Sequence, residues 1–280
     1  MSKNLPNRVI SNQTRANVRR VELLRRILEV VAKAGRGHLG PALSILDILE
    51  VLYGSVMRNY RNLDDATRDR FILSKGHGCL GLYVVLEKYE LLQDHDLDTF
   101  CSFSSIFGGH PESFELPHIE FSTGSLGHGP SLATGLAMGA KLHKTDSRIY
   151  VLIGDGEINE GSVWEAAMHA HKHKLNNLCF IVDNNGMQAN GKVEDVVNLE
   201  PLKQKWEAFG FSVREVDGHN SADLEAALNF QLQDSLKPKI VIAKTIKGRG
   251  LKEAENSSFW HHKAKITRED VNRLLEGLIE

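Results

Sequence analysis

Two short polar turns, each directly after an apolar run, carry residue types that bind a metal ion. GDG at 154–156 follows IYVLI, and NN at 184–185 follows LCFIVD. The spacer of 27 residues between them, 157–183, is about the length of one helix and a returning strand. Carboxylate and amide oxygens, here those of Asp155 and Asn185, are ligands that Mg²⁺ prefers. We therefore expect both turns at one edge of a parallel sheet, where they bind a metal and phosphate groups.

Glycine and a helix start favour phosphate binding at the same place. Gly154 and Gly156 let the backbone approach a phosphate closely, and a helix that opens at 160–162 offers unpaired N–H groups to a diphosphate. Each turn alone also suits an ordinary tight turn, because Gly, Asp and Asn favour turns anyway. The spacing of the two turns favours the metal–diphosphate site.

Three histidines have neighbours typical of a functional loop. His38, His77 and His110 each lie beside glycine in a segment that follows a regular element, which is where a protein presents reactive groups. An imidazole with an ordinary pKa of about 6.5 can take up or release a proton near neutral pH. We expect these side chains to act in proton transfer or hydroxyl binding.

The elements that position these residues alternate along the chain. Apolar periodicity predicts helices over 14–34, 44–60, 80–92, 130–143, 162–174, 199–209, 221–234 and 267–279. The clearest strand candidates are 148–153, 177–182, 211–216 and 239–243. This alternation predicts an α/β fold, with a mostly parallel central sheet flanked by helices on both faces.

One long segment interrupts this alternation. Residues 101–130 contain five Gly, three Pro and six Ser, and loops of that length inside a compact domain are usually functional or disordered. Its aromatic and histidine residues favour order. With no repeat, low-complexity tract or linker, the whole chain 1–280 is expected to be a single domain.

Composition excludes several classes of protein. With 34 basic and 36 acidic side chains the net charge is -2, which argues against a nucleic-acid protein or one held on an anionic membrane. The longest apolar run is far below the roughly 20 residues that cross a bilayer. Three cysteines with no CxxC suggest neither a disulfide framework nor a zinc site. A cytoplasmic location fits best.

Taken together, the motifs from about 18 to 263 resemble the diphosphate-binding, N-terminal half of a transketolase. GDG with a spacer near 27 residues and NN is the fingerprint of thiamine diphosphate enzymes. The other matching segments are AGRGHLGPALSILDIL at 34–49, RFILSKGHG at 70–78, GGHPE at 108–112, STGSLGHG at 122–129, GDGEINEG at 154–161, KTIKGRG at 244–250 and WHHK at 260–263.

The resemblance implies roles for single residues. Asp155, the side chain of Asn185 and the backbone carbonyl of Met187 match the metal ligands, for Mg²⁺ or its substitutes Ca²⁺ and Mn²⁺. Positions that line or bind thiamine diphosphate are matched by His77, Gly124, Leu126, Gly154, Asp155, Gly156 and Asn185. The histidines around the reactive thiazolium carbon are matched by His38, His77, His110 and His261. Glu160 matches an acid that couples paired active sites at a subunit interface, and Glu165 belongs to the same network.

The resemblance also implies a partner. The family's activating glutamate and its sugar-phosphate arginines lie in a second, pyrimidine-binding part, which this chain of 280 residues does not include. We expect one subunit of a split transketolase that forms a heterodimer or heterotetramer with a C-terminal subunit. Together they would transfer a two-carbon ketol unit from a ketose or ketose phosphate to an aldose.

Three departures from the family pattern leave the sugar donor open. Leu39 stands where proline is usual, His128 where glutamine is usual, and His262 where glycine is common. A standard ketose phosphate, a sulfonated ketose and a branched-sugar derivative all fit.

Three other functions stay open. The α subunit of a 2-oxo acid dehydrogenase also carries GDG and NN, although the histidine set favours ketol transfer. The chain is also compatible with a noncatalytic regulatory paralogue of the same fold, or with a generic nucleotide-binding α/β domain.

Overall fold

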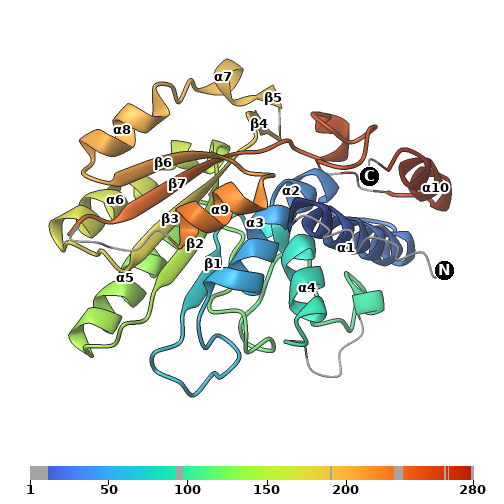
Figure 1. Cartoon of the computed structure of the whole chain (residues 1–280). Helices are drawn as coiled ribbons and strands as arrows, with labels where there is room; N and C mark the ends of the chain where they lie inside the picture. The colour runs from blue at the N-terminus through green and yellow to red at the C-terminus, as the bar shows by residue number, and fades with distance from the viewer. Residues whose placement is uncertain are drawn as a thin grey trace, which may run out of the picture.

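A five-stranded parallel sheet lies at the centre of the computed structural model, which describes residues 12–92, 97–189, 191–229, 236–261, 263 and 265–278 (Figure 1). The strand order is β1–β2–β3–β7–β6, and all four neighbouring pairs are parallel. The strands are β1 (Arg70–Leu73), β2 (Ile149–Gly154), β3 (Leu178–Asn184), β6 (Ser212–Asp217) and β7 (Lys239–Lys244). The predicted α/β fold with a parallel sheet is confirmed.

Helices cover both faces of the sheet (Figure 1). The longer ones are α1 (Asn12–Ala34), α4 (Cys79–Lys88), α5 (His128–Leu142), α6 (Gly161–Lys172), α8 (Leu202–Ala208), α9 (Ser221–Leu228) and α10 (Arg268–Glu276). Shorter pieces are α2 (Leu39–Ser44), α3 (Leu46–Val51) and α7 (Val193–Val196), with a small hairpin of β4 (Met187–Gln188) and β5 (Gly191–Lys192). No helix among these residues is long and apolar enough to cross a membrane.

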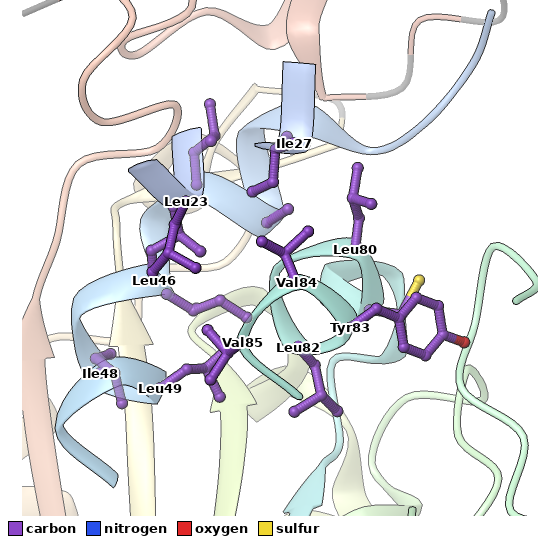
Figure 2. Close-up of a cluster of buried hydrophobic side chains, with 14 of the residues drawn as sticks. Leu23, Ile27, Leu46, Ile48, Leu49, Leu80, Leu82, Tyr83, Val84 and Val85 are labelled. Atoms are coloured by element: carbon purple, nitrogen blue, oxygen red, sulfur yellow. The ribbon is translucent and has the colours of Figure 1, made fainter. Parts of the chain in front are cut away.

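Alternation along β2 separates two hydrophobic cores. Ile149, Val151 and Ile153 lie in a core with α5, α6 and α8, whereas Tyr150 and Leu152 lie in a core with α1, α3, α4 and α9. Successive side chains of a strand point to opposite faces, so a fully apolar strand is buried on both. Figure 2 shows the second core, in which side chains of α1, α3 and α4 interlock.

The predicted helix over 44–60 is wrong at its C-terminal end. The helical segment runs from α2 through α3 into a π-helical turn, Leu52–Val56, and Met57 is already extended. Arg58 cannot continue the helix, because its backbone N–H donates to the carboxylate of Asp69 at 2.9 Å. A polar contact that is distant in sequence thus ends the helix where periodicity alone would extend it.

Other predicted helices differ mainly at their ends. α4 stops at Lys88, before Glu90 takes a left-handed conformation with φ 56°. α10 begins after Thr267, which forms a capping box with Asp270. The predicted helix 221–234 matches α9 as far as Leu228, and its residues 230–234 lie outside the described residues.

Candidate functional site

The carboxyl ends of β1, β2, β3 and β7 meet at one edge of the sheet. In register, Gly154 of β2 lies opposite Asp183 of β3, and Asp183 lies opposite Ala243 of β7. The two polar turns that follow β2 and β3 are therefore neighbours, and the N–H of Gly186 donates to the carboxylate of Asp155 at 2.6 Å. The sequence prediction that these turns share one edge is confirmed.

Asp155 is a buried carboxylate whose hydrogen bonds come from backbone N–H groups. It is 2% exposed, and its second oxygen accepts the N–H of Gly156 at 2.7 Å. Burial and the nearby carboxylate of Asp183 raise the pKa of Asp155 to about 6, although the two amide bonds and Lys75 act in the opposite direction. Among the described residues no lysine or arginine forms an ion pair with Asp155. Its charge is therefore available to a bound cation.

Asp183 is the centre of a buried polar cluster beneath the two turns. It forms an ion pair with Lys75 and accepts bonds from Ser44 at 2.7 Å, Asn185 at 2.9 Å and the hydroxyl of Thr245. Burial alone would raise the pKa of Asp183, but Lys75 and these hydrogen bonds outweigh it and lower the pKa. This cluster fixes the Asn185 side chain from below.

A second buried cation, Lys247, lies at the predicted metal ligands. Its Nζ donates to the carbonyl of Met187 at 3.0 Å, and the Oδ1 of Asn185 accepts the N–H of Met187 at 3.0 Å. Burial, followed by repulsion from Lys75, lowers the pKa of Lys247 to about 8. Asp155, Asn185 and the Met187 carbonyl thus lie within one hydrogen-bonded unit.

The space beside these groups fits an acceptor-rich ligand. Nε2 of Gln188 is buried and has no hydrogen-bond partner in the part of the chain that the structure describes. Gln188 also packs on Gly156, where a Cβ atom would approach the Gln188 Cβ to 3.1 Å. A buried donor without a partner is costly, and a phosphate or hydroxyl oxygen would satisfy it. The oxygen ligands and this unpaired donor therefore fit a metal-bound diphosphate.

The four predicted histidines form one cluster. The ring centroid of His38 lies 5.8 Å from that of His77, 5.9 Å from that of His110 and 6.2 Å from that of His261, and His77 lies 5.5 Å from His261. They come from four separate segments of the chain. Burial, then Lys75 and the neighbouring histidines, lower the pKa of His77 far below its usual range, so that this ring is neutral.

The glycine-rich turn before α5 closes the cluster on one side. A Cβ atom at Gly124, whose φ is 147°, would approach the His110 ring to 3.1 Å. A Cβ atom at Gly76 would lie 2.8 Å from the backbone N of Gly124. Only glycine permits these approaches, which bring His77 and His110 together. Leu126, in the same turn, is 36% exposed.

Not every predicted residue belongs to this cluster. Glu160 is the exposed N-cap residue of α6 and lies over the turn, because a Cβ atom at Gly127 would come within 2.7 Å of the Glu160 Cβ. Glu165 is exposed on α6. Leu39 is fully buried in α2, and His128 is exposed with its Nδ1 3.1 Å from the Ser125 carbonyl. His262 lies outside the described residues.

Lys75, Asp183 and Lys247 were missed as functional candidates by the sequence analysis. Lys75 stands two residues before His77, and Asp183 stands directly before the NN turn. Their adjacency to motifs at strand ends was an available signal, but the ion pair between Lys75 and Asp183 joins residues 108 positions apart.

Comparison with known proteins identifies this arrangement. Residues 16–278 match the family model described as transketolase, thiamine diphosphate binding domain. This chain belongs to the transketolase family. The family relationship supports thiamine diphosphate as the ligand of the diphosphate site.

Some relatives are covered by this chain over most of their length. It is 43% identical over 239 residues to an apulose-4-phosphate transketolase subunit of Phocaeicola vulgatus, with 85% of each chain covered. It is 37% identical over 243 residues to the 6-deoxy-6-sulfo-D-fructose transketolase subunit SqwG of a Clostridium strain, covering 86% of this chain and 88% of that protein. The chain therefore corresponds to the N-terminal subunit of split transketolases.

A solved structure shows the same fold within a longer protein. The transketolase of Campylobacter jejuni superposes with a TM-score of 0.82 at 34% identity, covering 94% of this chain. This chain spans only 42% of that transketolase. The match therefore covers less than half of a whole transketolase.

Proposed function

We propose that the chain binds the diphosphate of thiamine diphosphate through Mg²⁺ and, with a partner subunit, transfers a two-carbon ketol unit from a ketose to an aldose acceptor. One observation carries this proposal: the joined turns at Asp155 and Asn185 share an edge of the sheet with the cluster of four histidines. A metal–diphosphate site alone would suit many enzymes, whereas the histidines supply groups for sugar chemistry.

The metal would be held by Asp155, the Oδ1 of Asn185 and the carbonyl of Met187. All three are hard oxygen ligands, which suit Mg²⁺ and admit Ca²⁺ or Mn²⁺ in its place. Lys75 and Lys247 are buried beside these groups and add positive charge where a diphosphate brings negative charge.

The histidines would bind the sugar and move protons. Thiamine diphosphate, when bound, supplies the electron sink for cleavage of the carbon–carbon bond. His77 is neutral because its pKa is lowered, so one ring nitrogen can donate a hydrogen bond to a hydroxyl group and the other can accept one. His38 lies next to His77, His110 and His261 in one cluster, and Gly124 packs against the His110 ring. We propose that Gly124 and Leu126 border the same site.

Glu160 and Glu165 would act at an interface between paired sites rather than on the sugar. Both side chains are exposed at the start of α6, where they can meet another subunit. This placement supports the coupling role that the family resemblance implies.

The names of two relatives and the exposed aromatic side chains of this chain both support a partner subunit. Two relatives that this chain covers almost fully are called subunits, which is said of those proteins. In this chain Phe103, Phe114 and Phe259 are 109%, 94% and 61% exposed. In sequence, Phe114 lies four residues after His110 and Phe259 two residues before His261. Aromatic side chains are enriched at protein interfaces. We propose that a C-terminal, pyrimidine-binding subunit covers them in a heterodimer or heterotetramer, with an interface above about 2,000 Å².

The substrate class is narrowed by the same relatives. Their names refer to apulose 4-phosphate and to a sulfonated fructose, so we propose a donor from this wider range of ketoses.

The three cysteines are free thiols, which supports a reducing, cytoplasmic location.

A native mass spectrum of the tagged chain, isolated from its host in thiamine diphosphate and Mg²⁺, tests the proposal. We expect a heteromer with about one cofactor for each pair of subunits, and a partner whose sequence contains a pyrimidine-binding domain. Absence of both cofactor and partner would reject the proposal in favour of a noncatalytic paralogue.

A further inference from the structure

A single buried carboxylate, that of Glu157, joins three segments of the site. Glu157 is 2% exposed and lies in the short turn after β2. One of its oxygens, Oε1, accepts the hydroxyl of Ser74 and the N–H of Gly127 at 2.8 Å. The other, Oε2, accepts the N–H of Gly154 at 3.1 Å. Both oxygens are thus used by donors from the chain itself.

Each donor lies in a segment that carries proposed cofactor residues. Ser74 follows β1 and precedes His77, Gly127 ends the turn that contains Gly124 and Leu126, and Gly154 directly precedes Asp155. Ser74, Gly127 and Gly154 are far apart in sequence, and all three donate to the same carboxylate.

The packing around these bonds leaves little room for adjustment. Gly127 has φ 83°, its carbonyl accepts the Ser162 hydroxyl at 2.9 Å, and a Cβ atom there would meet that hydroxyl at 2.6 Å. Gly129, at the start of α5, packs directly on Ser74. The turn is therefore held from both sides by the segment 157–162.

We propose that Glu157 is a positioning residue of the cofactor site: it sets the distance between the His77 segment, the turn at 124–127 and the metal turn at Asp155. Among the described residues its carboxylate makes no hydrogen bond to a proposed metal ligand or to a histidine. This inference rests on the proposed function for its consequence, cofactor affinity. The positioning itself is a property of the unliganded chain and can be tested there.

The variant Glu157→Gln changes the hydrogen bonds of this side chain but keeps its volume. A glutamine side chain fills the same volume, but one oxygen becomes an NH₂ group, which then faces an N–H donor that it cannot bind. Supporting groups around metal ligands typically change affinity by about 10- to 100-fold when they are altered. We expect the dissociation constant for thiamine diphosphate with Mg²⁺ to rise within that range.

Asp69→Asn is the matched control. Asp69 is also a fully buried carboxylate that accepts two backbone N–H groups, of Arg58 and Arg148, both at 2.9 Å, but it lies before β1 at the opposite edge of the sheet. Its loss should lower stability without changing cofactor affinity. Glu157→Asp is a second variant, in which the charge is kept but the carboxylate is shortened; it should also weaken binding.

Two measurements on the native complex decide the matter. Hydrogen exchange without cofactor should become at least about tenfold faster at the amides of Gly127 and Gly154 in Glu157→Gln and stay unchanged there in Asp69→Asn. Calorimetry should then show weaker cofactor binding in Glu157→Gln and Glu157→Asp but not in Asp69→Asn.

Unchanged exchange at both glycines, unchanged cofactor affinity, or equal weakening by Asp69→Asn would each overturn the positioning role. If the wild-type complex itself does not bind thiamine diphosphate, the proposed function fails, and the exchange measurement still decides whether Glu157 holds the three segments together.

Discussion

The two ends of the central sheet both bury carboxylates, but they satisfy them differently. At the amino end, Asp69 accepts two backbone N–H groups and two bonds from the Arg58 guanidinium, at 3.1 and 2.9 Å. At the carboxyl end, Asp155 accepts two backbone N–H groups and forms no ion pair with a lysine or arginine among the described residues. The charge of Asp69 is thus compensated by Arg58, whereas no described lysine or arginine forms an ion pair with Asp155.

The cations at the two ends repeat this contrast. Near the amino end, Arg68 and Arg70 both bind Glu120. At the carboxyl end, the buried Lys247 donates to backbone carbonyls of Met187 and Gln188 instead of to a carboxylate. A buried charge without a side-chain counter-charge is costly. Burial alone therefore does not mark a site, whereas separated buried charges of both signs indicate a place for a cation and an anion.

Asp155→Ala should have the largest effect on this contrast. Removing the carboxylate takes away the proposed principal metal ligand, so we expect no measurable Mg²⁺-dependent binding of thiamine diphosphate in calorimetry of the complex. Asp69→Asn should bind normally. If Asp155→Ala still binds thiamine diphosphate in a Mg²⁺-dependent way, Asp155 is not a metal ligand.

Lys75→Met should lower stability strongly. It leaves Asp183 buried without its ion-pair partner, which typically costs about 3–5 kcal/mol of unfolding free energy. Arg58→Met should cost less, because 37% of the Arg58 side chain is exposed and water can reach the place that it leaves. Urea unfolding of both variants measures the difference, and equal losses would contradict the view that the more deeply buried pair contributes more to stability.

His110→Ala should separate chemistry from cofactor binding. His110 belongs to the histidine cluster but contacts none of the proposed metal ligands, so cofactor affinity should be kept while turnover of the donor falls by about 10²-fold or more. His143→Ala, at the exposed end of α5, is the control and should behave like the wild type. Steady-state kinetics of the complex gives both values, and an unchanged turnover would exclude His110 from the reaction.

The smallest effect should be a change in pH dependence. The pKa of His77 is lowered in the folded chain by burial, so the unfolded state takes up its proton near pH 6.5 while the folded state does not. The free energy of unfolding should therefore fall as the pH drops below about 6.5. Its slope against pH corresponds to the uptake of at most one additional proton by the unfolded state. His77→Gln should show a shallower decrease between about pH 7 and 5 in denaturant titrations. An identical slope would mean that His77 titrates normally in the fold.

Much of the fold and part of the site followed from the sequence because they depend on local patterns. The apolar runs before GDG and NN, and the spacer between them, predicted that Asp155 and Asn185 meet at one edge. Glycine neighbours pointed to His38, His77 and His110 individually. That these rings meet in one cluster, together with His261, followed only from the family resemblance, because no local pattern spans such separations.

The rest depends on contacts between distant residues. Lys75 and Asp183 are residue types that usually lie at the surface, and their pairing is visible only once β1 and β3 are in one sheet. The end of the helical segment at Val56 likewise depends on Asp69, which holds the backbone of Arg58. Helix periodicity contains no information on such bonds.

The most direct test of the account is the metal dependence of cofactor binding by the wild-type complex. Thiamine diphosphate would be titrated calorimetrically into the complex, once with Mg²⁺ and once with EDTA. The uncompensated carboxylate of Asp155 and the fit of its neighbours to a diphosphate predict binding of about one cofactor per pair of subunits with Mg²⁺ and loss of that binding with EDTA. Equal affinity under both conditions, or no binding in either, would contradict the account.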